Sequence, residues 1–200
     1  MLFRLFTAAL VVALCFFLYK SYGYRYVLDD VRDTAPAATI MGPELAPINI
    51  VAYLDYGSSW SRRAHPVLLQ ILSENPDVNM IIKPYPGLSE RSVLATRMAL
   101  AAIQDNVFLD VHGILIDTPE NYSNDYLKKA MQLRGLDYDA LAARANSPIV
   151  DEMVKDIKKE ALLLGVNTTP HVFIENAPVV GGVSFLELEK IVSEVRTGRR

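Results

Sequence analysis

The sequence has a single cysteine among its 200 residues, and this residue, Cys15, lies within the first twenty positions. The rest of the chain therefore has no internal disulfide, no cysteine-based zinc site and no redox-active cysteine pair. The chain also lacks an excess of positive charge: 20 Lys and Arg stand against 23 Asp and Glu, which gives a formal net charge of −3. That balance argues against a nucleic-acid-binding protein, because such proteins usually carry a basic surface.

Histidine is scarce as well, with three in the chain. His65, His112 and His171 fall in separate predicted elements and have no paired spacing such as His-x-x-x-His. We therefore expect no metal site, and no motif indicates a bound cofactor. Apolar residues, in contrast, are plentiful. A composition of 51% hydrophobic and 22% charged residues predicts one packed domain, with room for an appendage.

The N-terminus has an uncharged apolar run over residues 5–19, between Arg4 and Lys20. This is the layout of a secretory signal. A cleaved signal needs small residues at the cut, whereas bulky residues follow this run, so we predict an uncleaved transmembrane signal anchor over residues 1–22. The tyrosines that follow, up to Tyr26, resemble an interfacial aromatic belt. Basic residues lie on both sides of the run, so charge alone leaves the orientation open.

After the anchor, residues 23–47 contain three prolines and predict a semi-extended linker. The folded domain is then expected over residues 48–200. Its pattern predicts strands over 48–54, 78–83, 171–174 and 178–180, helices over 58–73 and 184–195, and helices throughout 89–164. This order predicts an α/β sheet with an all-helical insertion.

With these elements in place, the chain resembles the DsbA-like branch of the thioredoxin superfamily. The resemblance covers about residues 42 to 196 and implies a thioredoxin-like fold with a helical insertion, facing the periplasm or an equivalent extracytoplasmic space. It rests on six segments in the order typical of that family, namely Gly42–Pro47, Val51–Tyr56, Arg62–Pro66, Val107–His112, Gly165–Ile174 and Gly181–Leu188.

One segment departs from the family. Where its members have Cys-x-x-Cys, this chain reads Ser58-Ser59-Trp60-Ser61. In the family, the first cysteine lies at a helix N-terminus, where the helix dipole lowers the thiol pKa and favours the thiolate. Disulfide exchange needs that thiolate and a second thiol to resolve the mixed disulfide. A hydroxyl has neither the acidity nor the sulfur, so we predict no thiol–disulfide oxidoreductase activity and no catalytic residue in this motif.

The segment around Thr169 and Pro170 matches the family's cis-proline loop. The resemblance implies a cis bond between them and a Thr169 backbone that faces the Ser58 helix. In redox relatives this backbone pairs with an extended substrate polypeptide. Our hypothesis is therefore a membrane-tethered, non-catalytic adaptor or chaperone-like protein that binds extended polypeptide or an envelope partner in a groove formed by Ser58, Trp60, Thr169, Pro170 and His171. The sequence leaves the oligomeric state open.

Two enzymatic alternatives use Ser58. Kappa-class glutathione transferases share this fold and have serine at the matching position, where the hydroxyl would activate the thiolate of glutathione. This chain lacks the proline that usually follows that serine. A serine hydrolase would need Asp55 and His65 as partners. On a helix that begins near Ser58, however, His65 lies about two turns away, or roughly 10 Å, and is out of reach of the hydroxyl.

Overall fold

The computed structural model describes residues 6–7, 10–15, 23–87, 89–119 and 122–199. The predicted transmembrane anchor over residues 1–22 therefore lies mostly outside the described residues. Those of its residues that are described, 6–7 and 10–15, are helical, and their side chains are exposed. No helix within the described ranges has the length and apolar character needed to cross a membrane.

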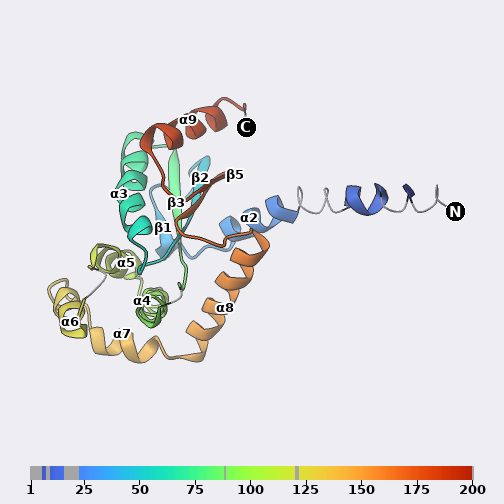
Figure 1. The fold of residues 1–200 in the computed structure, drawn as a ribbon. Coiled ribbons are helices and arrows are strands. Elements are labelled where there is room, and N and C mark those ends of the chain that lie inside the picture. The colour runs from blue at the N-terminus through green and yellow to red at the C-terminus, as the bar shows by residue number, and fades with distance from the viewer. Residues whose placement is uncertain (1–5, 8–9, 16–22, 88, 120–121, 200) are drawn as a thin grey trace.

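The domain is built on a five-stranded sheet with the strand order β1-β3-β2-β4-β5 (Figure 1). The central strands β2 and β3 run parallel, with Ile48 opposite Val78, and their side chains are almost entirely buried. β4 runs antiparallel to β2, and β5 pairs antiparallel with β4 at the edge. The strands are β1 (Ile40–Met41), β2 (Ile48–Leu54), β3 (Val78–Pro84), β4 (His171–Ile174) and β5 (Ala177–Val180).

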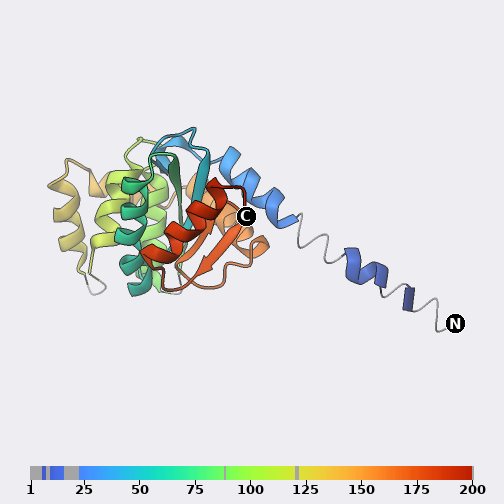
Figure 2. The same ribbon diagram turned by 90° about the horizontal axis from the view of Figure 1, so that it is seen from above.

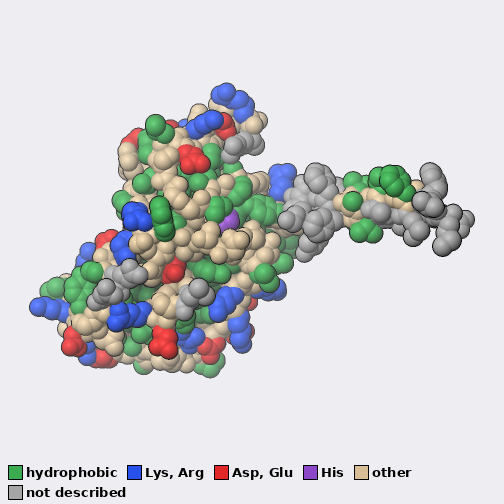
Figure 3. Space-filling view, viewed as in Figure 1, with side chains coloured by type: hydrophobic (Ala, Val, Ile, Leu, Met, Phe, Trp, Pro, Cys, Tyr) green, Lys and Arg blue, Asp and Glu red, His purple; other side chains and the backbone are tan. Residues whose placement is uncertain are grey.

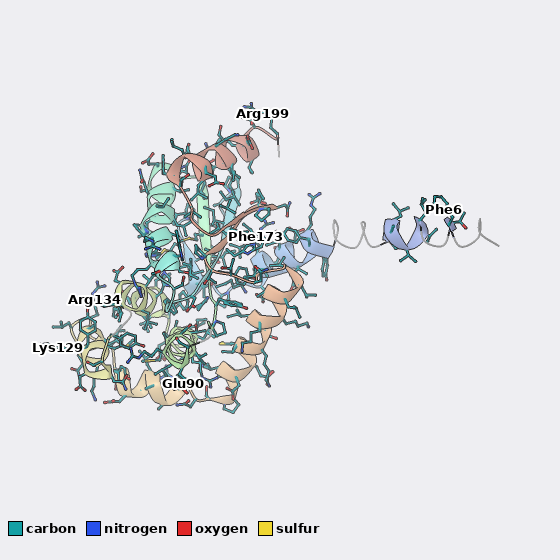
Figure 4. All side chains as sticks on the ribbon, viewed as in Figure 1. Phe6, Glu90, Lys129, Arg134, Phe173 and Arg199 are labelled. Carbon is teal, nitrogen blue, oxygen red and sulfur yellow. The ribbon has the colours of Figure 1, made fainter. Side chains whose placement is uncertain are left out.

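Helices cover both faces of the sheet. α3 (Ser59–Glu74) and α9 (Phe185–Arg196) pack on each other and on the strands, and they lie side by side in Figure 2. The other face carries Tyr53 and Phe173, whose rings meet edge to face at 6.2 Å. α2 (Tyr24–Asp33) and α8 (Pro148–Leu163) pack on each other over this face, and Phe173 is labelled where it lies beside α2 in Figure 4.

The chain between β3 and β4 forms the helical insertion expected over residues 89–164. Figure 1 shows α4 to α7 gathered at one end of the sheet, with α8 extending beside the sheet until it meets α2. Side chains at the N-caps fix the start of several helices; for example, Ser89 accepts a hydrogen bond from the Ser92 N–H. The insertion comprises α4 (Glu90–Ala101), α5 (Phe108–Asp117), α6 (Asn124–Gln132), α7 (Tyr138–Arg144) and α8 (Pro148–Leu163).

The segment predicted as a linker over residues 23–47 is instead largely structured. It contains helix α2 (Tyr24–Asp33), in which Leu28 and Val31 are fully buried, and the short strand β1. The apolar residues of α2 recur every three to four positions and form a stripe that packs on the domain. The prolines that suggested an extended chain lie beyond the end of this helix. The linker prediction was therefore wrong for this part of the chain.

Candidate functional site

The Ser58-Ser59-Trp60-Ser61 motif lies at the N-terminus of α3, directly after the turn that ends β2. Ser58 is the N-cap residue: its Oγ accepts a hydrogen bond from the Ser61 N–H at 3.3 Å. The Asp55 carboxylate accepts hydrogen bonds from the Gly57 N–H at 2.8 Å and from the hydroxyl of Ser92 on α4. One carboxylate thus holds the turn before α3 against the start of the insertion.

The two serines at the ends of the motif have different environments. Ser61 is fully buried, at 0% exposure, and its Oγ accepts a hydrogen bond from the Asp55 N–H at 3.2 Å. Ser58 is half-buried, and its side chain reaches the neighbouring loop. Ser58 is therefore the member of this pair that faces the candidate binding surface.

The loop before β4 lies against Ser58. The Thr169–Pro170 peptide bond is cis, as the resemblance implied. The Ser58 hydroxyl lies 3.4 Å from the Thr169 carbonyl oxygen, to which it donates a hydrogen bond. The Pro170 carbonyl accepts a hydrogen bond from the Gly181 N–H, which ties the loop to the end of β5. Thr169 is half-buried, and its own N–H has no hydrogen-bond partner among the described residues.

Trp60 is the exposed aromatic residue of the motif, with 57% of its surface accessible. The Arg63 guanidinium lies 4.3 Å from the centroid of its ring, a cation–π contact within the same helix. On another side the ring meets Gly182, where an added Cβ would lie 3.4 Å from the Trp60 Cζ3. Trp60 therefore joins the start of α3 to the loop between β5 and α9.

Behind the motif, two histidines from different elements meet. The Nε2 atoms of His65 on α3 and His112 on α5 are 3.1 Å apart, and the Tyr56 hydroxyl lies 2.9 Å from the His112 Nδ1. A hydrogen bond between the two Nε2 atoms requires one ring to carry its hydrogen on Nε2 and the other to present a bare Nε2 as the acceptor. Burial lowers the pKa of His112 to about 3, with His65 adding to the shift. Burial also lowers the pKa of His65, although the Asp117 carboxylate opposes that shift.

The sequence places these histidines in separate elements and does not predict their contact. It also does not predict a partly buried ion pair on the opposite face of the sheet. The Lys83 ammonium lies 2.8 Å from the Glu160 carboxylate, and the Tyr53 hydroxyl is 3.5 Å from the same oxygen atom. Burial and this carboxylate both raise the pKa of Tyr53. The only sequence signal for this pair is a lysine near the end of a largely apolar strand.

His171, the fifth residue of the predicted groove, lies on the sheet. Its ring stacks on Phe173 with 4.8 Å between the centroids, and burial lowers its pKa. Its Nδ1 has no hydrogen-bond partner in the described part of the chain. Of the residues predicted to form the groove, the structure thus joins Ser58 to Thr169 directly and places His171 against the aromatic side chains of the sheet. Within the described ranges, no cluster of three or more His, Cys, Asp or Glu side chains is arranged to hold a metal ion.

Comparisons with known proteins agree with this geometry. The family model described as Thioredoxin matches residues 34–194. A thioredoxin-like oxidoreductase from Silicibacter pomeroyi DSS-3 is 26% identical, with a TM-score of 0.76 over 84% of this chain and 97% of that one. The catalytic domain of Proteus mirabilis ScsC is 26% identical, with a TM-score of 0.72 over 85% of this chain and 97% of that one.

A third solved structure is that of a periplasmic thioredoxin-like protein from Salmonella enterica serovar Typhimurium. It is 28% identical, with a TM-score of 0.71 over 84% of this chain and 95% of that one. The comparison with curated proteins gives no match.

Proposed function

Because the chain belongs to the thioredoxin family, in its DsbA-like branch, we propose that it is a redox-inactive, membrane-anchored member that binds extended polypeptide or an envelope protein as an adaptor or chaperone. The observation that carries this proposal is the contact of the Ser58 Oγ with the Thr169 carbonyl, 3.4 Å away. Hydroxyls thus stand where the family has sulfur, while the neighbouring cis-proline loop is kept.

The loss of redox activity follows from the chemistry of the hydroxyl group. Thiol–disulfide exchange proceeds through a thiolate that attacks a disulfide and a second thiol that resolves the product. Ser58 and Ser61 provide neither sulfur, and Cys15 lies within the predicted anchor, with α2 between it and the motif. Ser61 is also buried, which removes it from contact with a bound partner.

Polypeptide binding uses groups that need no sulfur. The Thr169 N–H, without a partner among the described residues, is free to donate to a carbonyl of an extended chain, as in strand addition. Two residues after Ser58, which contacts Thr169, the exposed ring of Trp60 offers the kind of aromatic contact that dominates many binding interfaces. A backbone donor and an apolar ring at the same end of α3 fit a partner segment in extended conformation with an apolar side chain.

Two further observations support the membrane anchor and the extracytoplasmic location. The described residues of the N-terminal run expose apolar side chains, among them Phe6, Leu10 and Val12, as Figure 3 shows for this segment. Such side chains are stable in lipid but costly in water. The Salmonella protein, a similar structure, is described as periplasmic. We therefore place the folded domain outside the cytoplasm.

The glutathione alternative has less support from the site. A serine that activates glutathione donates its hydroxyl hydrogen to the thiolate, whereas the Ser58 hydroxyl donates to the Thr169 carbonyl. Calorimetric titration of the full chain with glutathione, with Ser58→Ala as the control, distinguishes a glutathione-binding enzyme from a polypeptide-binding protein. Heat of binding that disappears in Ser58→Ala would favour the enzyme.

The polypeptide-binding proposal is tested by the fluorescence of Trp60, the only tryptophan in the chain. The full chain in detergent micelles is titrated with reduced and carboxymethylated ribonuclease A, which stays unfolded and contains no tryptophan. We expect a saturable change in emission. With a labelled form of the same polypeptide, Trp60→Ala should weaken binding by about 1–2 kcal/mol, or roughly fivefold to thirtyfold.

Leu133→Ala is the matched control, because this leucine is also exposed and apolar but lies beyond α6, on the insertion. It should bind like the unaltered chain. Equal affinity of Trp60→Ala and Leu133→Ala, or no binding by the unaltered chain, would contradict the proposal.

A further inference from the structure

The start of α2 and the C-terminal end of α8 enclose a cavity of about 250 Å³. Gly23, Tyr24 and Val27 line it from the α2 side, and residues 162–165 line it from the other. The two segments are far apart in sequence, but both views of the ribbon place the end of α8 beside α2 (Figures 1 and 2). Whatever lies next to the first residues of α2 therefore also lies next to the end of α8.

The end of α8 is unusually apolar for a surface. Leu162 is 79% exposed and Leu163 is 47% exposed, although the same helix buries Ile157 and Ala161 on its inner side. Lys158 and Lys159, one turn earlier, are exposed on the same outward face, because residues three and four apart on a helix are neighbours. This end of α8 thus presents two leucines flanked by two lysines.

The position of this surface in the chain indicates its partner. The proposed anchor ends at residue 22, and Tyr24 follows two residues later, at most about 7 Å further along the chain. Since Tyr24 and the α8 leucines line one cavity, the leucines lie near the point where the chain leaves the membrane. An apolar surface with basic neighbours is typical of segments that rest on an anionic lipid surface.

We propose that the end of α8 rests on the membrane, with Leu162 and Leu163 in the interfacial region and Lys158 and Lys159 at anionic headgroups. This inference rests on the membrane anchor of the proposed function. α2 stabilises this contact of α8 with the membrane, because α2 itself is fixed to the domain. Its Leu28 is buried, and its Arg32 lies 3.3 Å from Glu175 at the end of β4. The domain is then held in one orientation on the bilayer.

The test places an environment-sensitive fluorophore on the full chain. In a Cys15→Ser background, Leu162→Cys is labelled, and Leu133→Cys is labelled as the matched control, because Leu133 is also 79% exposed but lies on the insertion. Both proteins are reconstituted into vesicles of three parts phosphatidylcholine to one part phosphatidylglycerol, with and without nitroxide-labelled lipid. Circular dichroism checks that both variants fold.

We expect the fluorophore at position 162 to emit at shorter wavelength and to be quenched by the nitroxide lipid several-fold more than the one at position 133. Replacing phosphatidylglycerol by phosphatidylcholine should reduce this quenching, because the lysines then lose their anionic partners. Equal quenching at the two positions overturns the inference. A shift to shorter wavelength without nitroxide quenching also overturns it, because the leucines would then be covered by protein.

Flotation of the same vesicles distinguishes this failure from failure of the anchor. If the chain floats with the vesicles but position 162 is not quenched, the anchor stands and the α8 contact is wrong. If the chain does not float, the anchor is wrong, and the α8 contact falls with it.

Discussion

The hydroxyl of Ser58 donates a hydrogen bond to the carbonyl of Thr169, 3.4 Å away. The first residue is the N-cap of α3, and the second precedes the cis proline, so the bond joins the two segments that meet at the redox site of this family. Because this arrangement is kept without sulfur, the site is suited to regain thiol–disulfide exchange when the two serines are replaced by cysteines.

Restoring both sulfurs should restore exchange chemistry. We expect the unaltered chain to reduce insulin no faster than the uncatalysed reaction, and Ser58→Cys/Ser61→Cys to reduce it measurably. The new thiol at position 58 lies at the N-terminus of α3, where the helix dipole lowers its pKa. Insulin precipitation in the presence of dithiothreitol measures the rate. Ser59→Cys/Ser61→Cys is the control, and a double variant at 58 and 61 that folds but has no activity would contradict this account.

The contact of Trp60 with Gly182 makes a second prediction. An added Cβ at Gly182 meets the ring at 3.4 Å, an ordinary van der Waals distance, so Gly182→Ala should leave the site nearly unchanged. The larger branches of Gly182→Val would meet the ring and displace it. We expect Gly182→Val to shift the Trp60 emission and to weaken polypeptide binding by about 1 kcal/mol, or roughly fivefold. If Gly182→Ala and Gly182→Val have identical emission and binding, the position of the Trp60 ring does not control polypeptide binding.

Acid should destabilise the fold through His112 and His65. Both have a folded-state pKa below the ordinary value of 6.5, so the unfolded chain binds their protons more readily. Stability is therefore full above about pH 7 and falls as the pH drops from 6.5 towards the pKa of His112, about 3. Each pH unit in that window costs up to about 1.4 kcal/mol through His112, and His65 adds a cost of the same sign. Protonation of both rings would also place two N–H groups face to face across the 3.1 Å gap.

Urea unfolding of the full chain in micelles, between about pH 7.5 and pH 5, measures this dependence in a range where few carboxylates titrate. His112→Asn should have a smaller slope of stability with pH. Tyr56→Phe removes a hydrogen bond to the same ring but keeps the titrating group, so its slope should resemble that of the unaltered chain. Equal slopes in all three proteins would show that these histidines do not control the acid response.

The docking of α2 predicts a stability effect far from the serine motif. Leu28 is fully buried, so Leu28→Ala should lower the free energy of unfolding by about 2–4 kcal/mol through lost contacts and the cavity it leaves. Tyr26, on the same helix, is exposed, and Tyr26→Ala should change stability by less than about 0.5 kcal/mol. Urea unfolding measures both. A near-zero effect of Leu28→Ala would mean that α2 is not part of the folding unit.

The sequence predicted those parts of the fold that are encoded locally. The strands over 48–54, 78–83 and 171–174 are each dominated by apolar and β-branched residues, and the structure has β2, β3 and β4 at these places within one residue. One helix escaped prediction, because α2 was hidden by the prolines that follow it. α7 lies in the region predicted to be helical throughout, but its seven residues are too few for a helical period to give its bounds.

The candidate site also has some features that the sequence predicts and others that depend on how separate elements pack. Ser58 as an N-cap and the cis Thr169–Pro170 bond were both predicted, the first from its place before a helical pattern and the second from the resemblance. The contact between the His65 and His112 rings depends on how α3 packs against α5. No spacing along one helix contains that information, because the contact joins side chains of two helices.

The hydrogen bonds that Asp55 accepts affect the affinity with which this protein can bind a partner. Its carboxylate receives both the Gly57 N–H before α3 and the Ser92 hydroxyl of α4, so the serine turn and the insertion are tied through one side chain. Loops that order on contact with a ligand lose conformational entropy at that moment and so reduce its affinity. Here the turn is ordered in advance, and an incoming chain would keep more of the energy of its contacts as affinity.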